Sequence, residues 1–469
     1  MPELPEVETV RATLEHQILN FKIIDVKVLC PRIVSGDIDS FRNKLIGKKI
    51  CKLQRYGKYL IFVFDDCSMI SHLRMEGKYF LKDQNDEIIK HEHVIFYFDN
   101  GLTLRYHDTR KFGIMRIVNK TDFNEIMKEP ELKKLGPEAN HPIDVDLFYQ
   151  KIHKLHKPIK EILLDQTIIC GLGNIYVDEV LFLSRINPVS SASLITKYEA
   201  SLILKNSEEV LGLAVKAGGT TIRSYTSSLG VTGRFQLNLN VHTKVDEPCP
   251  NCNTLIKKTR VGGRGTYYCP NCQKIHPLII GITGSISTGK STISNKLIEL
   301  GYQVIDTDKI ANELTKDRKI LENIKDLFGS EYINNNELDR KKLGQLIFKN
   351  IEERNKLNNF LHPLIKERTI KEIRNSDNHL IFIDVPLLFE SKFNELCNYN
   401  ICVSTSLSNQ IERLMKRDHI NKEEALIKIN SQMNLKKKEK LSDFIIDNSQ
   451  DLCYTYTQLQ NIISKLEGE

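Results

Sequence analysis

Long apolar runs are missing from this 469-residue chain. No stretch approaches the run of about 18 apolar residues that a transmembrane helix needs, so we expect no contact with a membrane. The opening residues MPELPEVETV lack the basic region and apolar core of a secretory signal, which predicts a cytoplasmic protein. Internal repeats and low-complexity linkers are also absent, and nothing in the sequence implies a protein partner.

Cysteine occurs without a disulfide pattern. Of eleven cysteines, four follow the spacing Cys-x2-Cys-x16-Cys-x2-Cys, at Cys249, Cys252, Cys269 and Cys272. This spacing is typical of a tetrahedral zinc site, and four thiolates leave no open position, so we expect one structural and not a catalytic Zn²⁺. The other seven are scattered, and we interpret them as reduced buried thiols.

Charge divides the chain unevenly. Residues 278–469 contain 28 basic and 28 acidic side chains, so the whole net charge of +7 comes from residues 1–277. A positive excess favours a polyanionic partner, whereas a neutral module suits a small metabolite. Many soluble domains carry as much charge, so this observation only supports a division into two functions near Pro277.

The first hundred or so residues read as strands. Residues 59–64, 94–98 and 102–106 are rich in β-branched and aromatic side chains, and the turn signal Asp99-Asn100-Gly101 separates two of these segments. This pattern predicts an antiparallel β-sandwich. From Leu132 to about Lys216 the apolar spacing becomes helical, which predicts a helical domain after the sandwich.

A phosphate-binding loop follows the cysteines. Residues 278–283 read as a buried strand and residues 291–300 as an amphipathic helix, the flanks that such a loop requires. Backbone amides of the loop can surround phosphates, Lys290 can reach the β and γ oxygens, and the Ser291 hydroxyl can bind Mg²⁺. The expected ATP-binding residues are Gly284, Ser285, Ile286, Ser287, Thr288, Gly289, Lys290, Ser291 and Thr292.

Three motifs in residues 1 to about 274 resemble formamidopyrimidine-DNA glycosylase. They are MPELPEVET at the start, GLGNIY at 171–176 and GRGT at 263–266. We regard two prolines and three glutamates at the chain start as a poor beginning for a helix or strand, which makes the first motif specific. The resemblance implies double-stranded damaged DNA as the partner.

The resemblance also implies catalytic residues. Once Met1 is removed, the secondary amine of Pro2 has a pKa of roughly 7.7 to 8.0 and can attack a sugar C1′ as a nucleophile. Glu3 is implied to be a general acid, with Glu6 ordering the nucleophile or a water. Lys58 is implied to assist the first elimination, and Arg264 to protonate the second leaving phosphate.

The same resemblance implies residues that contact DNA. Met75, Arg110 and Phe112 match the trio that fills the space left by an extruded base. Without the resemblance, Met75 and Phe112 would be expected in the core. Further implied contacts are His93, Lys111, Lys154 and Asn174, and implied lesion contacts are Glu76 and the loop from Gly218 to Gly230, including Thr220, Thr221 and Tyr225.

Residues from about 278 to 465 resemble dephospho-CoA kinase. The supporting motifs are VIDTD at 304–308, LHPLI at 361–365, DVPLLFE at 384–390 and the segment 410–418. The resemblance implies Asp308 as the base for the attacking ribose hydroxyl, Asp384 near Mg²⁺, and ATP and dephospho-CoA as substrates. Arg413 and Arg417 lie four residues apart, so both can point at phosphates from one helix face.

Some alternatives stay open. Arg340 and His362 are either substrate contacts or helix caps, Lys58 could be a solvated strand-edge residue, and the arginine pair could lie on a solvated helix face. Ser285 and Ser287 stand where the kinase family more often has glycine or alanine. A rival to the bifunctional enzyme is a non-catalytic damaged-DNA-binding module joined to a nucleotide sensor.

The predicted architecture is therefore an α+β glycosylase half with β-sandwich, helix-two-turn-helix and zinc ribbon, followed by an α/β P-loop kinase with a parallel sheet. The expected domains are 1–130 (catalytic β-sandwich), 131–235 (helix-two-turn-helix), 236–276 (zinc ribbon) and 278–469 (kinase).

Overall fold

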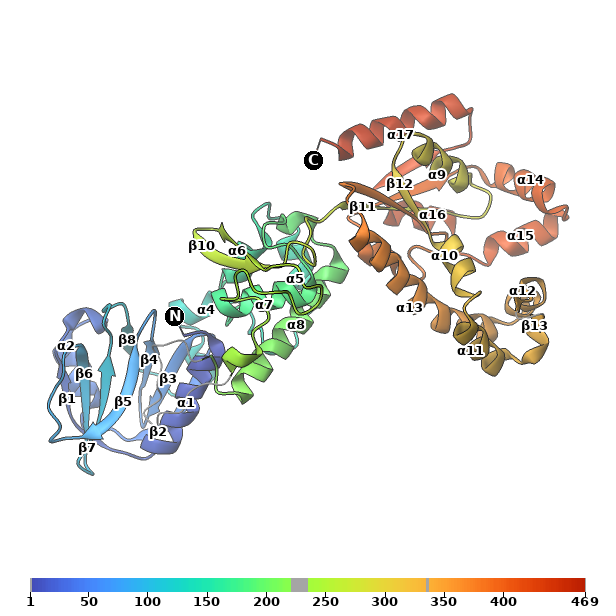
Figure 1. Cartoon of the computed structure of the whole chain (residues 1–469). Coiled ribbons are helices and arrows are strands. Elements are labelled where there is room, and N and C mark those ends of the chain that lie inside the picture. The colour runs from blue at the N-terminus through green and yellow to red at the C-terminus, as the bar shows by residue number, and fades with distance from the viewer. Residues whose placement is uncertain (1, 221–234, 335–336, 469) are drawn as a thin grey trace. The chain divides into compact units, whose positions relative to one another are not determined.

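A computed structural model describes residues 2–220, 235–334 and 337–468 (Figure 1). The chain divides into two compact units. Residues 1–275, apart from 196–198, form the first unit, and residues 276–469 form most of the second. Among the described residues, no helix has both the length and the apolar character needed to cross a bilayer.

The first unit begins with a β-sandwich. Its strands are β1 (Ile23–Val28), β2 (Ile50–Tyr56), β3 (Tyr59–Phe64), β4 (Ser68–His72), β5 (Lys78–Asp83), β6 (Glu92–Phe98), β7 (Leu102–His107) and β8 (Ile114–Val118). They form two antiparallel four-stranded sheets, with the orders β1-β6-β7-β5 and β2-β3-β4-β8. The predicted strands and the turn at Gly101, which has φ +81°, are confirmed.

Apolar side chains from both sheets meet in one core. Phe62 of β3, Phe96 of β6 and Tyr106 of β7 are buried there. Two helices, α1 (Leu4–Ile18) and α2 (Ile38–Leu45), and the 3₁₀ turn η1 (Pro31–Ile33) add residues to the same core. The sheet that contains β3 is buried on its other face too, because Ile61 and Val63 pack with Ile126 and Leu132 in a second core.

The start of helix α1 contradicts our expectation that the first residues disfavour a helix. Pro5 lies in the first turn, where its missing N–H would have no helical partner in any case. Glu6 accepts the backbone N–H of Glu3 at 2.9 Å, which caps the helix start. The prolines and glutamates of the opening motif thus start a helix and do not prevent one.

The Tyr106 side chain packs against two surface loops. It is fully buried. A Cβ added at Gly113 would lie 1.7 Å from the Tyr106 hydroxyl oxygen, and one added at Gly77 would lie 2.2 Å from it. Gly77 follows the loop of Met75, and Gly113 follows the loop of Phe112. Because neither glycine has a Cβ, the Tyr106 ring can pack against both loops.

A helical domain and a ribbon complete the first unit. The helices are α3 (Phe123–Ile126), α4 (Pro130–Lys133), α5 (Val145–Ile152), α6 (Ile159–Leu164), α7 (Asn174–Ser184) and α8 (Lys197–Lys216), with 3₁₀ turns η2 (Ala192–Leu194) and η3 (Phe235–Asn238). The ribbon is the hairpin β9 (Lys257–Val261) and β10 (Arg264–Tyr268). Phe182 of α7 packs against Cys249 and Cys269, so the ribbon shares a small core with α7.

The second unit is an α/β fold. Its strands are β11 (Leu278–Gly284), β12 (Gln303–Asp306), β13 (Ile333–Asn334), β14 (Glu337–Leu338), β15 (Leu380–Asp384), β16 (Tyr399–Ser404) and β17 (Phe444–Asp447). Its helices are α9 (Lys290–Glu299), α10 (Thr307–Leu314), α11 (Arg318–Phe328), α12 (Arg340–Lys349), α13 (Ile351–Asn375), α14 (Leu407–Asp418), α15 (Lys422–Asn430), α16 (Leu435–Leu441) and α17 (Leu452–Leu466). The 3₁₀ turns are η4 (Ser330–Tyr332) and η5 (Phe393–Leu396).

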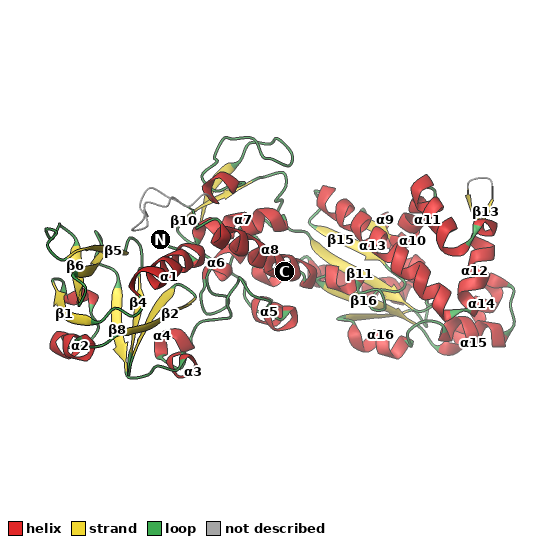
Figure 2. Ribbon diagram, turned by 90° about the horizontal axis from the view of Figure 1, so that it is seen from below, coloured by secondary structure: helices red, strands yellow, loops and turns green. Residues whose placement is uncertain are grey.

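Five strands of the second unit form the predicted parallel sheet, in the order β12-β15-β11-β16-β17. Helices lie on both faces (Figure 2). Ile381 and Ile383 pack on one face with α13, whereas Phe382 packs on the other with α9 and α17. Burial on both faces explains why residues 278–283 and 380–385 read as continuous apolar runs.

Replacing Gly113 with alanine should destabilise the sandwich. The new Cβ would overlap the buried Tyr106 phenol, and overpacking of this kind costs about 1–3 kcal/mol. Hydrogen exchange of β7 amides measures the loss. Gly212→Ala in α8, where nothing lies within 4 Å of the added Cβ, is the control and should stabilise its helix by about 0.5–1 kcal/mol. Unchanged β7 exchange in Gly113→Ala would contradict tight packing under the loops.

Candidate active sites

A buried carboxylate joins the chain start to α7. Glu3 is 2% exposed, and its two oxygens accept the N–H groups of Gly173 at 2.7 Å and Ile175 at 2.8 Å. These amides lie at the N-terminus of α7, where unpaired N–H groups and the helix dipole favour an anion. Burial raises the pKa of Glu3 above its ordinary value, against the opposing charge of Lys58. The carboxyl is therefore suited to exchange protons.

The first residues of the chain pack against a glycine-rich turn. The Leu4 N–H donates to the Gly171 carbonyl oxygen at 3.1 Å. A Cβ added at Gly173 would lie 2.3 Å from the Glu3 carboxyl carbon, so only glycine permits the contact. Pro2, immediately before Glu3, is half-buried. The structure thus brings together the two predicted residues of the opening motif and the GLGNIY motif.

Glu6 joins the same junction from the first turn of α1. Its Oε1 accepts the Tyr176 hydroxyl at 2.7 Å and the Thr220 N–H at 2.8 Å. A Cβ added at Gly219 would lie 2.8 Å from this carboxylate oxygen. Glu6 therefore connects α1 with α7 and with the end of the described segment before residue 221. The predicted lesion contacts Thr221 and Tyr225 lie outside the described residues.

Lys58 is buried, not a solvated strand-edge residue. It is 5% exposed, its Nζ donates to the Leu172 carbonyl oxygen at 2.6 Å, and burial lowers its pKa. The turn before it is clamped, because Glu138 accepts the Gly57 N–H at 2.8 Å and forms an ion pair with Arg55. Lys58 and Glu3 thus both bind the backbone just before α7.

Met75 and Phe112 are exposed, so neither is a core residue. The Arg110 guanidinium lies 5.0 Å from the centroid of the Phe112 ring. The buried Asp108 carboxylate shapes this loop, accepting the N–H groups of Arg110 at 3.0 Å and Phe112 at 2.8 Å. An exposed apolar ring beside a guanidinium is suited to enter a DNA stack, and this role stays a prediction.

The other predicted DNA contacts differ in exposure. Lys111 and Lys154 are exposed, and Lys111 adopts φ +58° at the tip of its loop. His93 is 6% exposed, and its Nε2 lies 2.8 Å from the Asp108 carbonyl oxygen. The two lysines can therefore reach a phosphate directly, whereas the His93 ring is covered by the Asp108 loop. All three roles stay predictions.

Asn174 and Arg264 are tied together through the ribbon hairpin. Asn174 is the first residue of α7, and its Nδ2 donates to the Gly265 carbonyl oxygen at 2.9 Å. Within the part of the chain that the structure describes, the buried Asn174 Oδ1 has no hydrogen-bond partner. Arg264 is exposed at the start of β10, after Gly263 with φ +74°. The hairpin tip thus lies beside the α7 N-terminus that holds Glu3.

The four ribbon cysteines fit a structural zinc ion. Their sulfur atoms all lie within 4.8 Å of one another. The distances are 3.8 Å between Cys249 and Cys272, 3.5 Å between Cys252 and Cys269, and 3.4 Å between Cys252 and Cys272. Four sulfurs about 2.3 Å from Zn²⁺ form a tetrahedron with edges of about 3.8 Å. The group therefore holds one Zn²⁺ in a closed, structural site.

In the second unit, the phosphate-binding loop connects β11 to α9. Gly289 has φ +96°, and its missing Cβ would lie 2.0 Å from the Asn448 Nδ2. That amide donates to the Thr288 carbonyl oxygen at 2.8 Å, so the loop is fastened to the end of β17. Ser287 adopts φ +59°, a conformation that strains any residue other than glycine. Ser287 is one of the two serines that stand where the kinase family more often has glycine or alanine.

Three aspartates lie where parallel strands end, the usual ligand edge of such sheets. Asp384 ends β15, forms an ion pair with Lys290, and accepts the Ser294 hydroxyl at 2.5 Å. Asp306 ends β12 and caps α10, accepting the Asp308 N–H at 2.8 Å. Asp308 is exposed to water, yet the surrounding protein raises the pKa of its carboxyl group. The charge of Lys290 lowers this pKa, and the charges of Asp306 and Asp384 raise it further.

The two predicted arginines of α14 have different partners. Arg413 donates to the Asn448 carbonyl oxygen at 3.0 Å and so lies against the phosphate-binding loop. Arg417 is exposed and forms an ion pair with Asp418 at 2.7 Å. The structure therefore places Arg413, and not Arg417, at the loop.

Arg340 caps the C-terminal end of α10, where its guanidinium donates to the Asn312 carbonyl oxygen at 3.1 Å, whereas His362 lies at neither end of α13. His362 lies inside α13 and lines an open cavity of about 280 Å³. Arg340 donates to the Thr315 hydroxyl at 2.7 Å, although it stands at the start of α12. The cavity favours a substrate contact for His362. The cavity is lined by Asn358, Asn359, His362, Pro363, Lys366 and Ser391.

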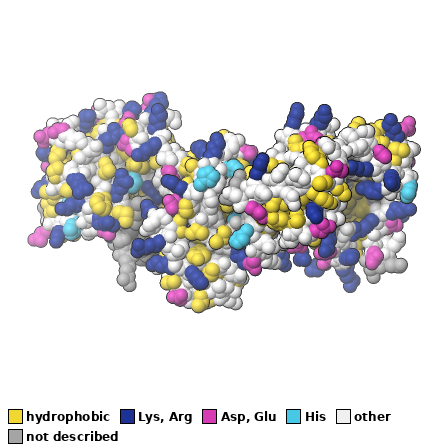
Figure 3. Space-filling view, turned by 90° about the horizontal axis from the view of Figure 1, so that it is seen from above, with side chains coloured by type: hydrophobic (Ala, Val, Ile, Leu, Met, Phe, Trp, Pro, Cys, Tyr) yellow, Lys and Arg dark blue, Asp and Glu magenta, His cyan; other side chains and the backbone are white. Residues whose placement is uncertain are grey.

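Sequence reasoning missed the residues that hold these sites together. Among them are Asp108, Glu138 and Asn448, whose partners lie far away in the chain or bind through backbone groups. The charge distribution is also a weak indicator of the division into two functions. Over the face shown in Figure 3, Lys and Arg side chains lie on both units, with Asp and Glu among them.

These features define a two-part chain, a DNA glycosylase of the helix-two-turn-helix type followed by a P-loop kinase. Four family models match it: the formamidopyrimidine-DNA glycosylase N-terminal domain at residues 1–115 and its H2TH domain at 135–226, the zinc finger found in FPG and IleRS at 246–275, and dephospho-CoA kinase at 278–453. The chain belongs to the formamidopyrimidine-DNA glycosylase family and carries a dephospho-CoA kinase domain after it.

Relatives of known function match the first unit. The formamidopyrimidine-DNA glycosylases of Ligilactobacillus salivarius and Enterococcus faecalis are each 47% identical over 277 residues, covering 59% of this chain and 99% and 98% of theirs. A solved complex between Lactococcus lactis Fpg and abasic-site DNA is 42% identical, with a TM-score of 0.55, and covers 58% of this chain and all of that one. The same values hold for L. lactis Fpg with N7-benzyl-Fapy-dG DNA.

Proposed function

We propose that the first unit excises oxidised purines, 8-oxoguanine and formamidopyrimidines, and then cleaves the DNA strand at the resulting abasic site. The observation that carries this proposal is the convergence of Glu3 and Lys58 on the backbone at the start of α7, whose first residue is Asn174, with Pro2 beside them. A damage-binding module without turnover would need no buried acid and buried amine with shifted pKa values at one junction.

The chemistry begins when removal of Met1 exposes the secondary amine of Pro2. Its nitrogen attacks C1′, the bond to the base breaks, and the base leaves with a proton. The amine then loses its own proton and the C1′–O4′ bond breaks, with a proton delivered to O4′, which leaves an iminium. This iminium acidifies the C2′ proton, whose loss breaks the C3′–O bond and releases the 3′ phosphate. Glu3, whose pKa is raised by burial, shuttles protons at the sugar, and Lys58 assists this first elimination.

DNA is held by groups around this junction. Arg110 and Phe112 enter the stack beside the extruded base, and Met75 fills the vacated space. Lys111, Lys154 and the Asn174 amide bind phosphates, the last at a helix N-terminus that favours anions, whereas His93 acts through the Asp108 loop that covers its ring. Arg264, at the hairpin tip, binds the phosphate that leaves in a second elimination. Solved relatives contain damaged DNA, which supports this assignment.

For the second unit, we infer phosphorylation of the 3′-hydroxyl of dephospho-CoA by ATP. The phosphate-binding loop, from Gly284 through Thr292, would hold the ATP phosphates with Lys290 and Arg413. Ser291 and, through water, Asp384 would hold Mg²⁺, which neutralises charge on the transferred phosphoryl group. Asp308 accepts the hydroxyl proton as the oxygen attacks the γ-phosphorus, and Arg417 reaches the phosphates when α14 and α15 close.

Borohydride trapping tests the first activity. Wild-type protein should become covalently linked to duplex DNA containing 8-oxoguanine, because borohydride reduces the iminium at Pro2. Pro2→Gly should trap about 100-fold more slowly, the cost of misplacing a reacting atom by roughly 1 Å. The same variant should keep one zinc ion per chain, which controls for folding of the first unit, and should phosphorylate dephospho-CoA at the wild-type rate. If the wild-type protein were not trapped, the rival hypothesis of a damage-binding module without turnover would be favoured.

The pH dependence of the kinase tests Asp308. A base must be deprotonated, so the rate should fall as pH falls through the raised pKa of Asp308. Asp306→Asn removes a charge that raises this pKa while keeping a side-chain oxygen to cap α10, so the acid limb should move to lower pH.

Asp317→Asn, the same exchange at the cap of α11, is the matched control and should leave the limb in place. A limb that also stays in place in Asp306→Asn would show that another group titrates.

A further inference from the structure

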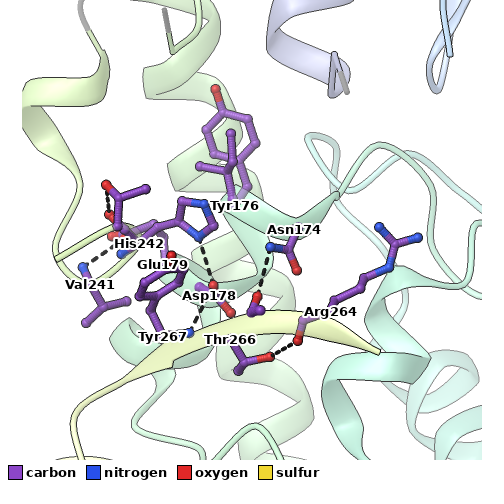
Figure 4. A network of polar contacts seen from close by, with 12 residues as sticks. Asn174, Tyr176, Asp178, Glu179, Val241, His242, Arg264, Thr266 and Tyr267 are labelled. Carbon is purple, nitrogen blue, oxygen red and sulfur yellow. Dashed lines mark hydrogen bonds and ion pairs between the residues drawn. The ribbon is translucent and has the colours of Figure 1, made fainter. Parts of the chain in front are cut away.

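A buried carboxylate on α7 binds the ribbon from inside the first unit (Figure 4). Asp178 is fully buried. Its Oδ1 accepts the Lys160 Nζ at 2.7 Å, and its Oδ2 lies 2.8 Å from the His242 Nδ1 and 3.3 Å from the Tyr267 backbone nitrogen, which donates to it. One side chain therefore joins α6, α7, the segment before the ribbon, and strand β10.

Lys160 carries this connection to the tip of the hairpin. Its fully buried Nζ donates to the Thr266 hydroxyl at 2.9 Å and to the Gly265 carbonyl oxygen at 3.2 Å. The Thr266 hydroxyl in turn donates to the Arg264 carbonyl oxygen at 3.0 Å. In Figure 4 the Arg264 side chain points away from this network, so its backbone is held while its guanidinium stays available.

The ammonium group depends on the carboxylate. Burial lowers the pKa of Lys160, and the charge and hydrogen bond of Asp178 oppose that effect. Without the negative charge, a buried ammonium would either lose its proton or move toward water, because an unpaired buried charge is strongly unfavourable. In both cases the contacts with Gly265 and Thr266 weaken, and the hairpin tip loses one of its anchors.

We propose that Asp178 is a positioning residue, which holds Arg264 in place for the second elimination through Lys160 and Thr266. This inference rests on the proposed lyase activity. In that step the sugar, still bonded to Pro2, loses its C4′ proton, the electrons shift along the conjugated system, and the C5′–O bond breaks. The phosphate leaves with the electron pair of that bond, next to the Arg264 guanidinium. Asp178 touches none of the reacting atoms.

The test uses the full chain and a duplex with a preformed abasic site. Asp178→Asn keeps the shape but removes the charge and turns an NH₂ group toward donors. The ratio of doubly to singly eliminated ends should fall about tenfold or more, since small misplacements of catalytic groups are costly. Borohydride trapping at Pro2 should fall far less than this ratio, because Asp178 bonds Lys160, His242 and Tyr267 and reaches Glu3 only through the charge of Lys160.

Two further variants make the result decisive. Thr266→Val breaks the same connection from the hairpin side and should lower the same ratio, with the zinc content still one per chain. Glu92→Gln removes a buried carboxylate paired with Arg105 at 3.1 Å in the sandwich, and should leave the ratio unchanged.

An unchanged ratio in both Asp178→Asn and Thr266→Val would overturn the proposal. Parallel loss of trapping and of second elimination in both variants would overturn it too, because it would show a general structural role. Failure of the wild-type protein to trap would instead refute the proposed lyase activity.

Discussion

The first site depends on one contact, the Glu3 carboxylate on the amides at the start of α7. It joins residues about 170 positions apart and sets the chain terminus, with Pro2, at the boundary between sandwich and helical domain. The helix dipole and two short hydrogen bonds favour the anion, while burial opposes it and raises the pKa. These opposing effects leave an acid that can gain and lose a proton in a fixed position.

A missing Cβ makes such contacts possible in both units. Gly173 leaves room for the Glu3 carboxyl group, Gly219 for that of Glu6, and Gly289 for the Asn448 amide. In each case a buried polar side chain binds the backbone of a turn that a methyl group would block. A polar side chain from an element distant in sequence therefore fastens each of these three turns.

Local patterns predicted the fold because their causes are local. Residues 59–64 are apolar throughout because both faces of β3 are buried, and a strand and a helix around the loop at 284–291 determine its type. The start of α1 was judged wrongly, because proline is tolerated in a first turn. The Lys160–Asp178 pair and the Glu138 clamp were invisible, since each depends on residues brought together only by folding.

The most direct test of the central contact leaves every reactive group intact. Gly173→Ala places a Cβ where the Glu3 carboxyl carbon would lie 2.3 Å away, at a backbone conformation that alanine can adopt. The rate of borohydride trapping at Pro2 on abasic DNA is then compared with that of the wild type. The account predicts a fall of about 100-fold with normal zinc content. Trapping at the wild-type rate would contradict it.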